Sequence, residues 1–103
     1  MNWLVEFRPE VYEDVTIAAD WYEQREPGLG SDFVEEIIQT WEEIGKNPWL
    51  GSKRHARLEV RWRYPHRFPY RVIYKIDETK QMVLLITVLH AARDERNWLK
   101  RVE

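Results

Sequence analysis

The chain has 103 residues, of which 44% are apolar and 33% are charged, so it is long enough for one domain with a single hydrophobic core. It contains no apolar run of membrane-spanning length and begins without the basic and apolar segments of a signal peptide, which predicts a cytoplasmic protein with no membrane partner. The absence of cysteine excludes disulfides, thiolate metal sites and thiol catalysis.

The net charge is only −2, but the two halves of the chain differ strongly. Residues 1–51 contain three basic and twelve acidic side chains, whereas residues 52–103 contain thirteen basic and six acidic ones. The division indicates either a surface suited to a polyanion or an acidic peptide, or two halves that neutralise each other where they pack. The chain contains six tryptophans and five tyrosines. We expect these aromatic side chains either to line a surface that binds a partner or to fill a thin core.

The first elements predicted are a short strand and a helix. Trp3, Val5 and Phe7 alternate with other residues in the period of a strand. Pro9 suits the first turn of a helix, and an amphipathic pattern continues from it to about Arg25.

A second helix is predicted a few residues later, so the two should form an antiparallel hairpin. Ser31 is its expected N-cap, and Gly45 is its expected end. Its expected buried stripe comprises Val34, Ile37, Ile38, Trp41 and Ile44.

Three strands follow in the second half. Strict alternation over residues 57–64 predicts a half-buried strand, with Val60 and Trp62 toward the core and Arg61 and Arg63 outward. Residues 70–76 and 82–89 predict two more strands joined by a turn. The order βααβββ, with a short terminal helix, predicts an α+β domain with a helical hairpin on one side of an antiparallel sheet.

Candidate catalytic residues gather at the end of the last hairpin. Arg71 projects from a strand and suits bidentate phosphate binding, although a cross-strand ion pair with Glu59 is the alternative. His90 suits a general base near neutral pH, or a structural hydrogen bond. Arg93 could contact an anion, or pair with Asp94, which could also cap the last helix.

Candidate binding residues form a basic stripe that could contact phosphates or a protein partner, although solvated charge is the commonest fate of such side chains. The stripe comprises Arg61, Arg63, Arg67, Lys53 and Arg54. Tyr74 is a further candidate, but it shares a face with apolar neighbours, which favours a core position. Trp98 and Asp94 complete the set. The spacing of the histidines matches no metal motif, so neither a metal nor a cofactor is predicted.

The element order, the strand YRVIYKI (70–76) and the ending LHAARDERNW (89–98) resemble the RelE/ParE superfamily of type II toxin–antitoxin toxins. The resemblance covers essentially all of residues 1–103 as one domain. It implies a helical hairpin on a curved antiparallel sheet, and an antitoxin whose C-terminal segment wraps the toxin in a hetero-oligomer. It also places Arg71 where the RelE family has its transition-state arginine.

The segment GLGSDF (28–33) and the residues His90, Arg93 and Asp94 are similar to the ParE, or plasmid-stabilisation, branch. Members of that branch are associated with poisoning DNA gyrase, while the RelE branch cuts messenger RNA in the ribosomal A site. The acidic net charge, and Trp98 near a position where RelE-type nucleases tend to have Tyr or His, favour growth inhibition by gyrase binding. The alternatives are a metal-independent endoribonuclease, with His90 as base and Arg71 and Arg93 on the phosphorane, and an orphan that only binds antitoxin.

Overall fold

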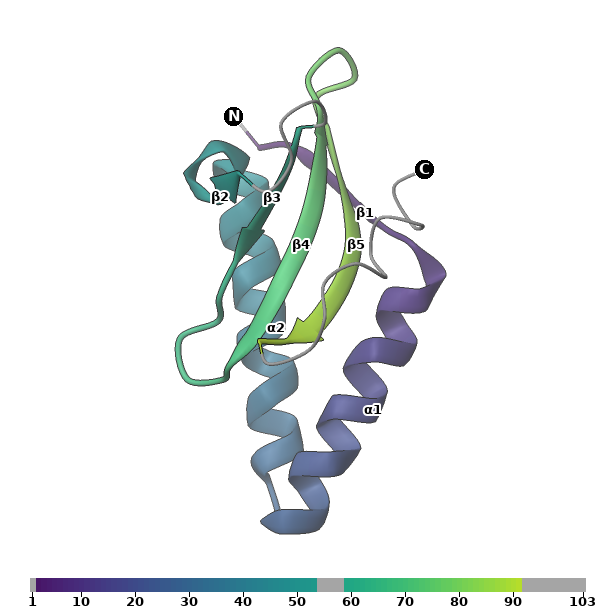
Figure 1. Cartoon of the computed structure of the whole chain (residues 1–103), viewed down its shortest axis with the longest axis vertical. Helices are drawn as coiled ribbons and strands as arrows, with labels where there is room; N and C mark the ends of the chain where they lie inside the picture. The colour runs from purple at the N-terminus through teal and green to yellow at the C-terminus, as the bar shows by residue number, and fades with distance from the viewer. Residues whose placement is uncertain (1, 54–58, 92–103) are drawn as a thin grey trace.

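The structure, a computed structural model, describes residues 2–53 and 59–91. The described part consists of two long helices and a curved sheet (Figure 1). None of the described helices is both long and apolar enough to cross a membrane. In chain order the elements are β1 (Leu4–Phe7), α1 (Pro9–Arg25), α2 (Leu29–Lys46), the 3-10 turn η1 (Pro48–Leu50), β2 (Ser52–Lys53), β3 (Val60–Arg63), β4 (Tyr70–Asp77) and β5 (Met82–His90).

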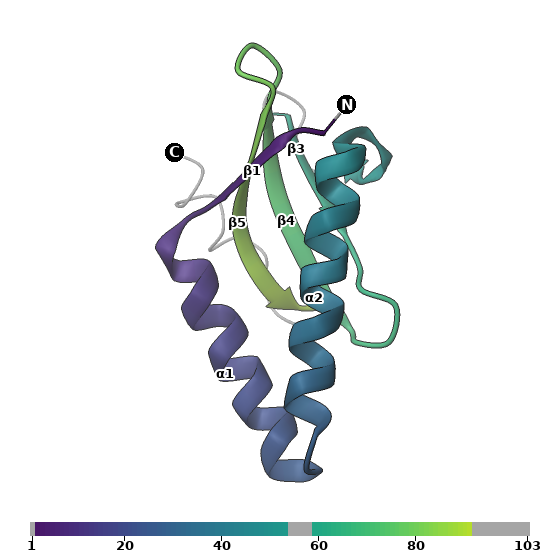
Figure 2. The same ribbon diagram turned by 180° about the vertical axis from the view of Figure 1, so that it is seen from behind.

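The strands form one sheet in the order β1-β5-β4-β3-β2. The predicted α+β fold is confirmed, with both helices on one side of the sheet (Figure 2). The sheet is mixed rather than wholly antiparallel, because β1 runs parallel to β5. Alternation predicts that a strand exists but not its direction. The helices and strands between β1 and β5 supply the long connection that a parallel pair needs.

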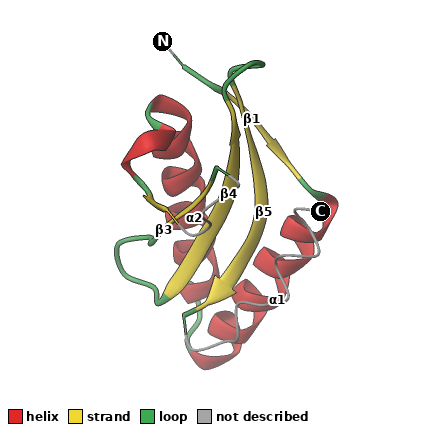
Figure 3. Cartoon of the chain, turned by 45° about the horizontal axis from the view of Figure 1, so that its top comes forward, coloured by secondary structure: helices red, strands yellow, loops and turns green. Residues whose placement is uncertain are grey.

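The hairpin of β4 and β5 is the longest part of the sheet, and it curves visibly (Figure 3). The pairing slips by one residue where Ile73 pairs with Thr87 and Tyr74 pairs with Leu85, which leaves Ile86 as a β-bulge. A bulge bends its strand and increases the local twist. We therefore attribute part of the curvature of the sheet to Ile86.

Helix α1 has the predicted bounds, but the predicted ends of α2 are wrong. Gly28 precedes α2 with a φ of 89°, a left-handed conformation that glycine adopts without strain. The carboxylate of Glu23 accepts hydrogen bonds from the backbone N–H groups of Gly28 and Gly30, so a side chain of α1 takes the capping role predicted for Ser31. Ser31 lies inside the first turn, beyond the start at Leu29.

Gly45 does not end α2, which continues to Lys46. Its backbone carbonyl accepts a hydrogen bond from Trp3 N at 2.7 Å. A Cβ atom on Gly45 would lie 3.1 Å from Val5 Cγ2, so the absent side chain allows close approach of β1. Sequence alone does not separate a glycine that stops a helix from one that admits a neighbouring strand.

Apolar side chains lie on both faces of the sheet. The helix-facing side contains the main core, in which Phe33, Ile37 and Ile44 of α2 pack with strand residues. A smaller cluster of Val60, Ile73 and Ile86, with Trp62 and Leu89 against it, lies on the opposite side, which we call the outer face. Figure 1 turns the outer face toward the viewer.

Val60 and Trp62 share an apolar face of β3, as predicted, but this face belongs to the smaller cluster rather than to the main core. Trp62 pairs with Ile73 and therefore lies on the outer face, whereas Arg63 pairs with Val72 and lies on the helix-facing side. Alternation with a period of two defines two faces but does not say which of them meets the helices.

Candidate functional site

An arginine stacked on an indole ring marks the outer face of the sheet. The guanidinium carbon of Arg71 lies 4.2 Å from the ring centroid of Trp62 on the neighbouring strand. Arg71 Nε donates to the hydroxyl of Tyr64 at 3.3 Å, and Tyr64 is 50% exposed. Stacking of this kind fixes the plane of the guanidinium, which suits bidentate recognition of a phosphate or carboxylate group.

His90 lies on the other side of the sheet from Arg71. It pairs with Tyr70 across the hairpin, and the two rings meet edge to face with centroids 5.1 Å apart. Tyr70 in turn packs against Phe33 in the helix-facing core. Arg71 pairs with Leu89, whose side chain belongs to the outer face.

The predicted catalytic pair is therefore not assembled in the described part of the chain. Arg71 and His90 lie at the same end of the hairpin, as expected, but successive strand residues point to opposite faces. The remaining candidates Arg93, Asp94 and Trp98 lie outside the described residues. The roles of all five in binding or catalysis stay predictions.

The basic stripe is largely paired within the protein. Arg63 forms an ion pair with Glu43 at 3.1 Å, and Arg67 bonds to Glu36 and lies 3.5 Å from Asp32. All three acids belong to α2, so these two arginines confirm that the acidic and basic halves neutralise each other where they pack. The side chain of Lys53, and Arg54 as a whole, lie outside the described set.

Arg61 is held by the loop that follows α2. Its guanidinium forms an ion pair with Glu59 at 3.0 Å, and it donates to the carbonyls of Trp49 and Gly51 at 3.0 and 2.8 Å. These bonds give Arg61 a structural role that its place in the predicted stripe did not indicate. The two carbonyl groups come from a loop whose fold cannot be derived from alternation.

Tyr74 is buried in the core, as its position on the strand predicted. Its hydroxyl donates to the carbonyl of Pro48 at 2.6 Å. Burial raises the pKa of Tyr74 to about 12, although the nearby Arg63 and Arg61 charges act in the opposite direction. The phenol is thus neutral at physiological pH, and it anchors η1 to the sheet rather than facing a partner.

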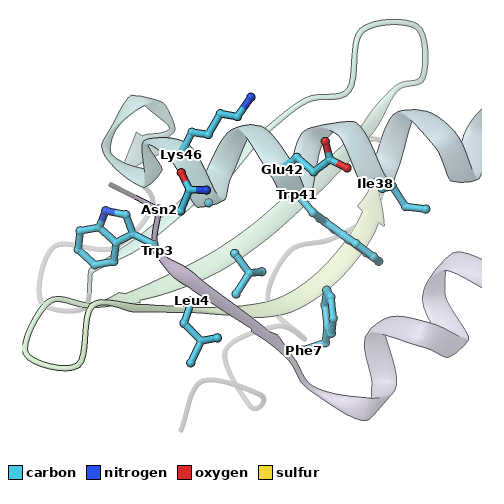
Figure 4. A pocket seen from close by; sticks show the side chains of 10 residues that line it. Asn2, Trp3, Leu4, Phe7, Ile38, Trp41, Glu42 and Lys46 are labelled. Atoms are coloured by element: carbon cyan, nitrogen blue, oxygen red, sulfur yellow. The ribbon is translucent and has the colours of Figure 1, made fainter.

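Two apolar hollows run along the exposed side of α2. One, of about 470 Å³, lies between β1 and α2 (Figure 4), and the other, of about 340 Å³, lies between α1 and α2. Ile38 and Trp41 line both, so the two hollows adjoin. We call the pair of hollows the α2 groove.

The sequence pattern does not predict the α2 groove, although it contains a signal for it. The pattern predicts that Ile38 and Trp41 are buried, but Ile38 is 42% exposed and Trp41 is only partly buried. The apolar stripe of α2 is therefore wider than the core that covers it. The indole Nε1 of Trp41 is buried and has no hydrogen-bond partner among the described residues.

The Glu36–Arg67 pair gives a pH-dependent prediction. Burial alone would raise the pKa of Glu36, but hydrogen bonds from the side chain and backbone N–H of Arg67 outweigh it and hold the pKa below 4.5. A depressed pKa stabilises the fold above the unfolded value, and this stabilisation is lost as the pH falls through the folded value. We expect the stability advantage of the wild type over Glu36→Gln to shrink below about pH 4.5 in denaturant titrations.

Glu35→Gln is the matched control, since Glu35 is the preceding residue of α2 and is exposed. The stability of Glu35→Gln should change with pH as the stability of the wild type does. Equal pH profiles for the two variants would show that the ion pair with Arg67 does not affect stability.

The helical hairpin on a mixed sheet is a small α+β fold that also occurs in solved structures from toxin–antitoxin systems. E. coli toxin RelE, a mutant in the free state, has a TM-score of 0.70 and 16% identity over 98% of this chain and 94% of that one. The chromosomal ParDE system from P. aeruginosa has a TM-score of 0.71 and 13% identity, covering 85% and 95%. The intact E. coli RelBE complex has a TM-score of 0.65 and 17% identity, covering 88% and 99%.

A family model described as the ParE toxin of the type II toxin–antitoxin system parDE matches residues 5–95. The chain belongs to this family, which confirms the resemblance to the RelE/ParE superfamily. A comparison with curated proteins gives no match.

Proposed function

We propose that the chain is a toxin that stops bacterial growth by binding DNA gyrase, without cutting RNA itself. The observation that carries this proposal is the separation of Arg71 and His90 onto opposite faces of the sheet. Cleavage needs a base within hydrogen-bond reach of the group that it deprotonates, whereas binding needs only a complementary surface. Gyrase is the target that the resemblance to the ParE branch implies.

The stacked Arg71 is the centre of the proposed target-binding surface. Arginine and the aromatic residues are the side chains that most often dominate the free energy of protein association. Trp62 and Tyr64 hold Arg71 on the outer face, which the two helices do not cover. We infer that the guanidinium meets an acidic or phosphate group of the target.

We further propose that an antitoxin, encoded by an adjacent gene, binds the chain and blocks its action in a hetero-oligomer. Support comes from solved neighbours that are toxin–antitoxin complexes, including RelBE from E. coli and RelBE2 from Mycobacterium tuberculosis. Gyrase and ribosomes are both cytoplasmic, so we place the action of the chain there.

The second candidate is a ribosome-dependent endoribonuclease, since the fold is as similar to RelE, with a TM-score of 0.70, as to ParDE, with 0.71. In that case His90 would take the 2′-hydroxyl proton, and Arg71 and Arg93 would stabilise the phosphorane. The RNA would have to reach both faces of the sheet at the end of the hairpin. An orphan that retains only antitoxin binding is the third candidate.

The decisive measurement compares the two targets directly. Induced expression of the chain should arrest growth, and co-expression of the adjacent gene should restore it. Purified chain should then inhibit supercoiling and trap cleaved DNA with gyrase, while mRNA on translating ribosomes stays intact. Cleavage at ribosomal A sites with normal supercoiling would replace the proposal with the nuclease, and normal growth at verified expression would replace it with the orphan.

A further inference from the structure

The loop that joins β3 to β4, residues 64–69, connects the two sides of the sheet. Tyr64, its first residue, accepts a hydrogen bond from Arg71 Nε at 3.3 Å on the outer face. Arg63, the last residue of β3, lies on the helix-facing side and forms its ion pair with Glu43 of α2 at 3.1 Å. Two adjacent residues thus link the Arg71 site on one side of the sheet to α2 on the other.

The rest of the loop also depends on α2 for its position. Glu36 accepts hydrogen bonds from the backbone N–H of Arg67, at 2.8 Å, and from the side chain of the same residue. The side chain of Glu36 is only 12% exposed, so water competes weakly for these bonds. Phe68 is buried and packs edge to face on Phe33 of α2, with ring centroids 5.1 Å apart. The loop is therefore fastened to the helix by both charged and apolar contacts.

The loop matters for Arg71 because an arginine binds a partner more tightly when its side chain is held in advance. A mobile side chain loses rotamer freedom on binding, whereas a preorganised one has lost it already. Trp62, which stacks on the guanidinium, belongs to β3 and is positioned by the sheet. Tyr64 lies just beyond the end of that strand. Its hydroxyl is therefore the contact to Arg71 that depends on the loop.

We propose that Glu36 and Glu43 of α2 are positioning residues for Arg71. They hold the 64–69 loop, so that Tyr64 keeps the guanidinium in its binding orientation. Neither carboxylate lies on the outer face, because α2 covers the opposite side of the sheet (Figure 2). The proposal rests on the target-binding role proposed for Arg71 above. It extends control of that role to residues of α2 that the target does not touch.

The first test follows the Arg71 Nε–H group by NMR in the free chain, so it does not involve the target. The Tyr64 hydroxyl and the Trp62 ring both determine the chemical shift of this group. Tyr64→Phe removes the hydrogen bond and should move the signal. Glu43→Gln and Glu36→Gln should move it in the same direction, because each weakens the hold on the loop. The amide oxygen of glutamine still accepts hydrogen bonds, so both variants should stay folded.

Glu42→Gln and Glu35→Gln are the matched controls for this test. Each removes the charge of the preceding residue, which is exposed on α2. Both should leave the Arg71 signal in place. The proposal would be overturned by a signal that responds to Glu43→Gln no more than to Glu42→Gln, and to Glu36→Gln no more than to Glu35→Gln.

The second test measures inhibition of gyrase supercoiling in a double-mutant cycle. Glu43→Gln alone should raise the concentration of the chain needed for half-inhibition at least about threefold, a coupling typical of residues in one network. In the Arg71→Ala background the same change should have no further effect, because the side chain that it positions is absent. A residue that only stabilises the fold would weaken inhibition equally in both backgrounds, and that result would refute positioning.

The two tests separate this inference from the proposed function. A chain that does not inhibit gyrase would overturn the proposed function, while the Arg71 signal in the free chain still decides whether α2 positions this side chain. Inhibition that depends on Arg71 but not on Glu36, Glu43 or Tyr64 would overturn the positioning and leave the proposed function intact.

Discussion

Replacing Arg71 with alanine should weaken growth inhibition about 30-fold or more, the effect of losing an interfacial arginine that contributes at least about 2 kcal/mol. His90→Gln should leave inhibition unchanged within about threefold, because a side chain outside the target-binding surface contributes little to the free energy of association. The reason is geometric, since Arg71 projects from the outer face while the His90 ring packs on Tyr70 toward the core. Both variants are compared by titrating expression against growth, with soluble protein quantified in each case.

The nuclease candidate makes the opposite prediction for His90. Loss of a general base lowers activity by roughly 10²- to 10⁴-fold. An inactive but stably folded His90→Gln chain would therefore refute gyrase binding as the sole mechanism. Arg71→Lys is the control for Arg71→Ala, because it retains the charge and loses the planar stack on Trp62.

Gly51→Ala should destabilise the fold by about 1–3 kcal/mol, the usual range for added volume at a tightly packed position. A Cβ atom there would overlap the hydroxyl of Tyr74 and lie 2.8 Å from the backbone carbonyl of Trp62. Neither group can withdraw easily, because Tyr74 is buried and the carbonyl belongs to β3. Chemical denaturation followed by tryptophan fluorescence measures the loss.

A double-mutant cycle identifies the cause of this loss. Tyr74→Phe alone removes the hydrogen bond to Pro48 and should cost about 1–3 kcal/mol. In the Gly51→Ala background the same change also removes one of the two colliding groups, so it should cost less by at least about 0.5 kcal/mol. Strictly additive losses would mean that the hydroxyl of Tyr74 is not what Gly51 accommodates.

The fold was largely predictable because its elements have strong local signals. Pro9 and the amphipathic pattern define α1, and the run of apolar residues in β5 defines a central strand. The start of α2 was not predictable, since its cap is Glu23 of the other helix, reached only after the chain turns at Gly28. Local patterns contain no information about such a contact between two elements.

The candidate site was less predictable for a similar reason. The sequence placed Arg71 and His90 at one end of a hairpin, but the bulge and register decide which face each side chain occupies. It also grouped Arg61, Arg63 and Arg67 as a binding stripe, whereas their acidic partners come from α2 and from Glu59. Charge counting identified the two complementary halves without showing which pairs would form.

The parallel pairing of β1 with β5 has a consequence for how the toxin is made. Leu4 is synthesised before both helices, but its partner Met82 is synthesised only after the helices and three further strands. The first strand therefore stays unpaired until β5 has been made, and contacts so distant in sequence also slow folding. A nascent chain that lacks β5 thus lacks a completed sheet, which delays the appearance of active toxin until β5 has left the ribosome.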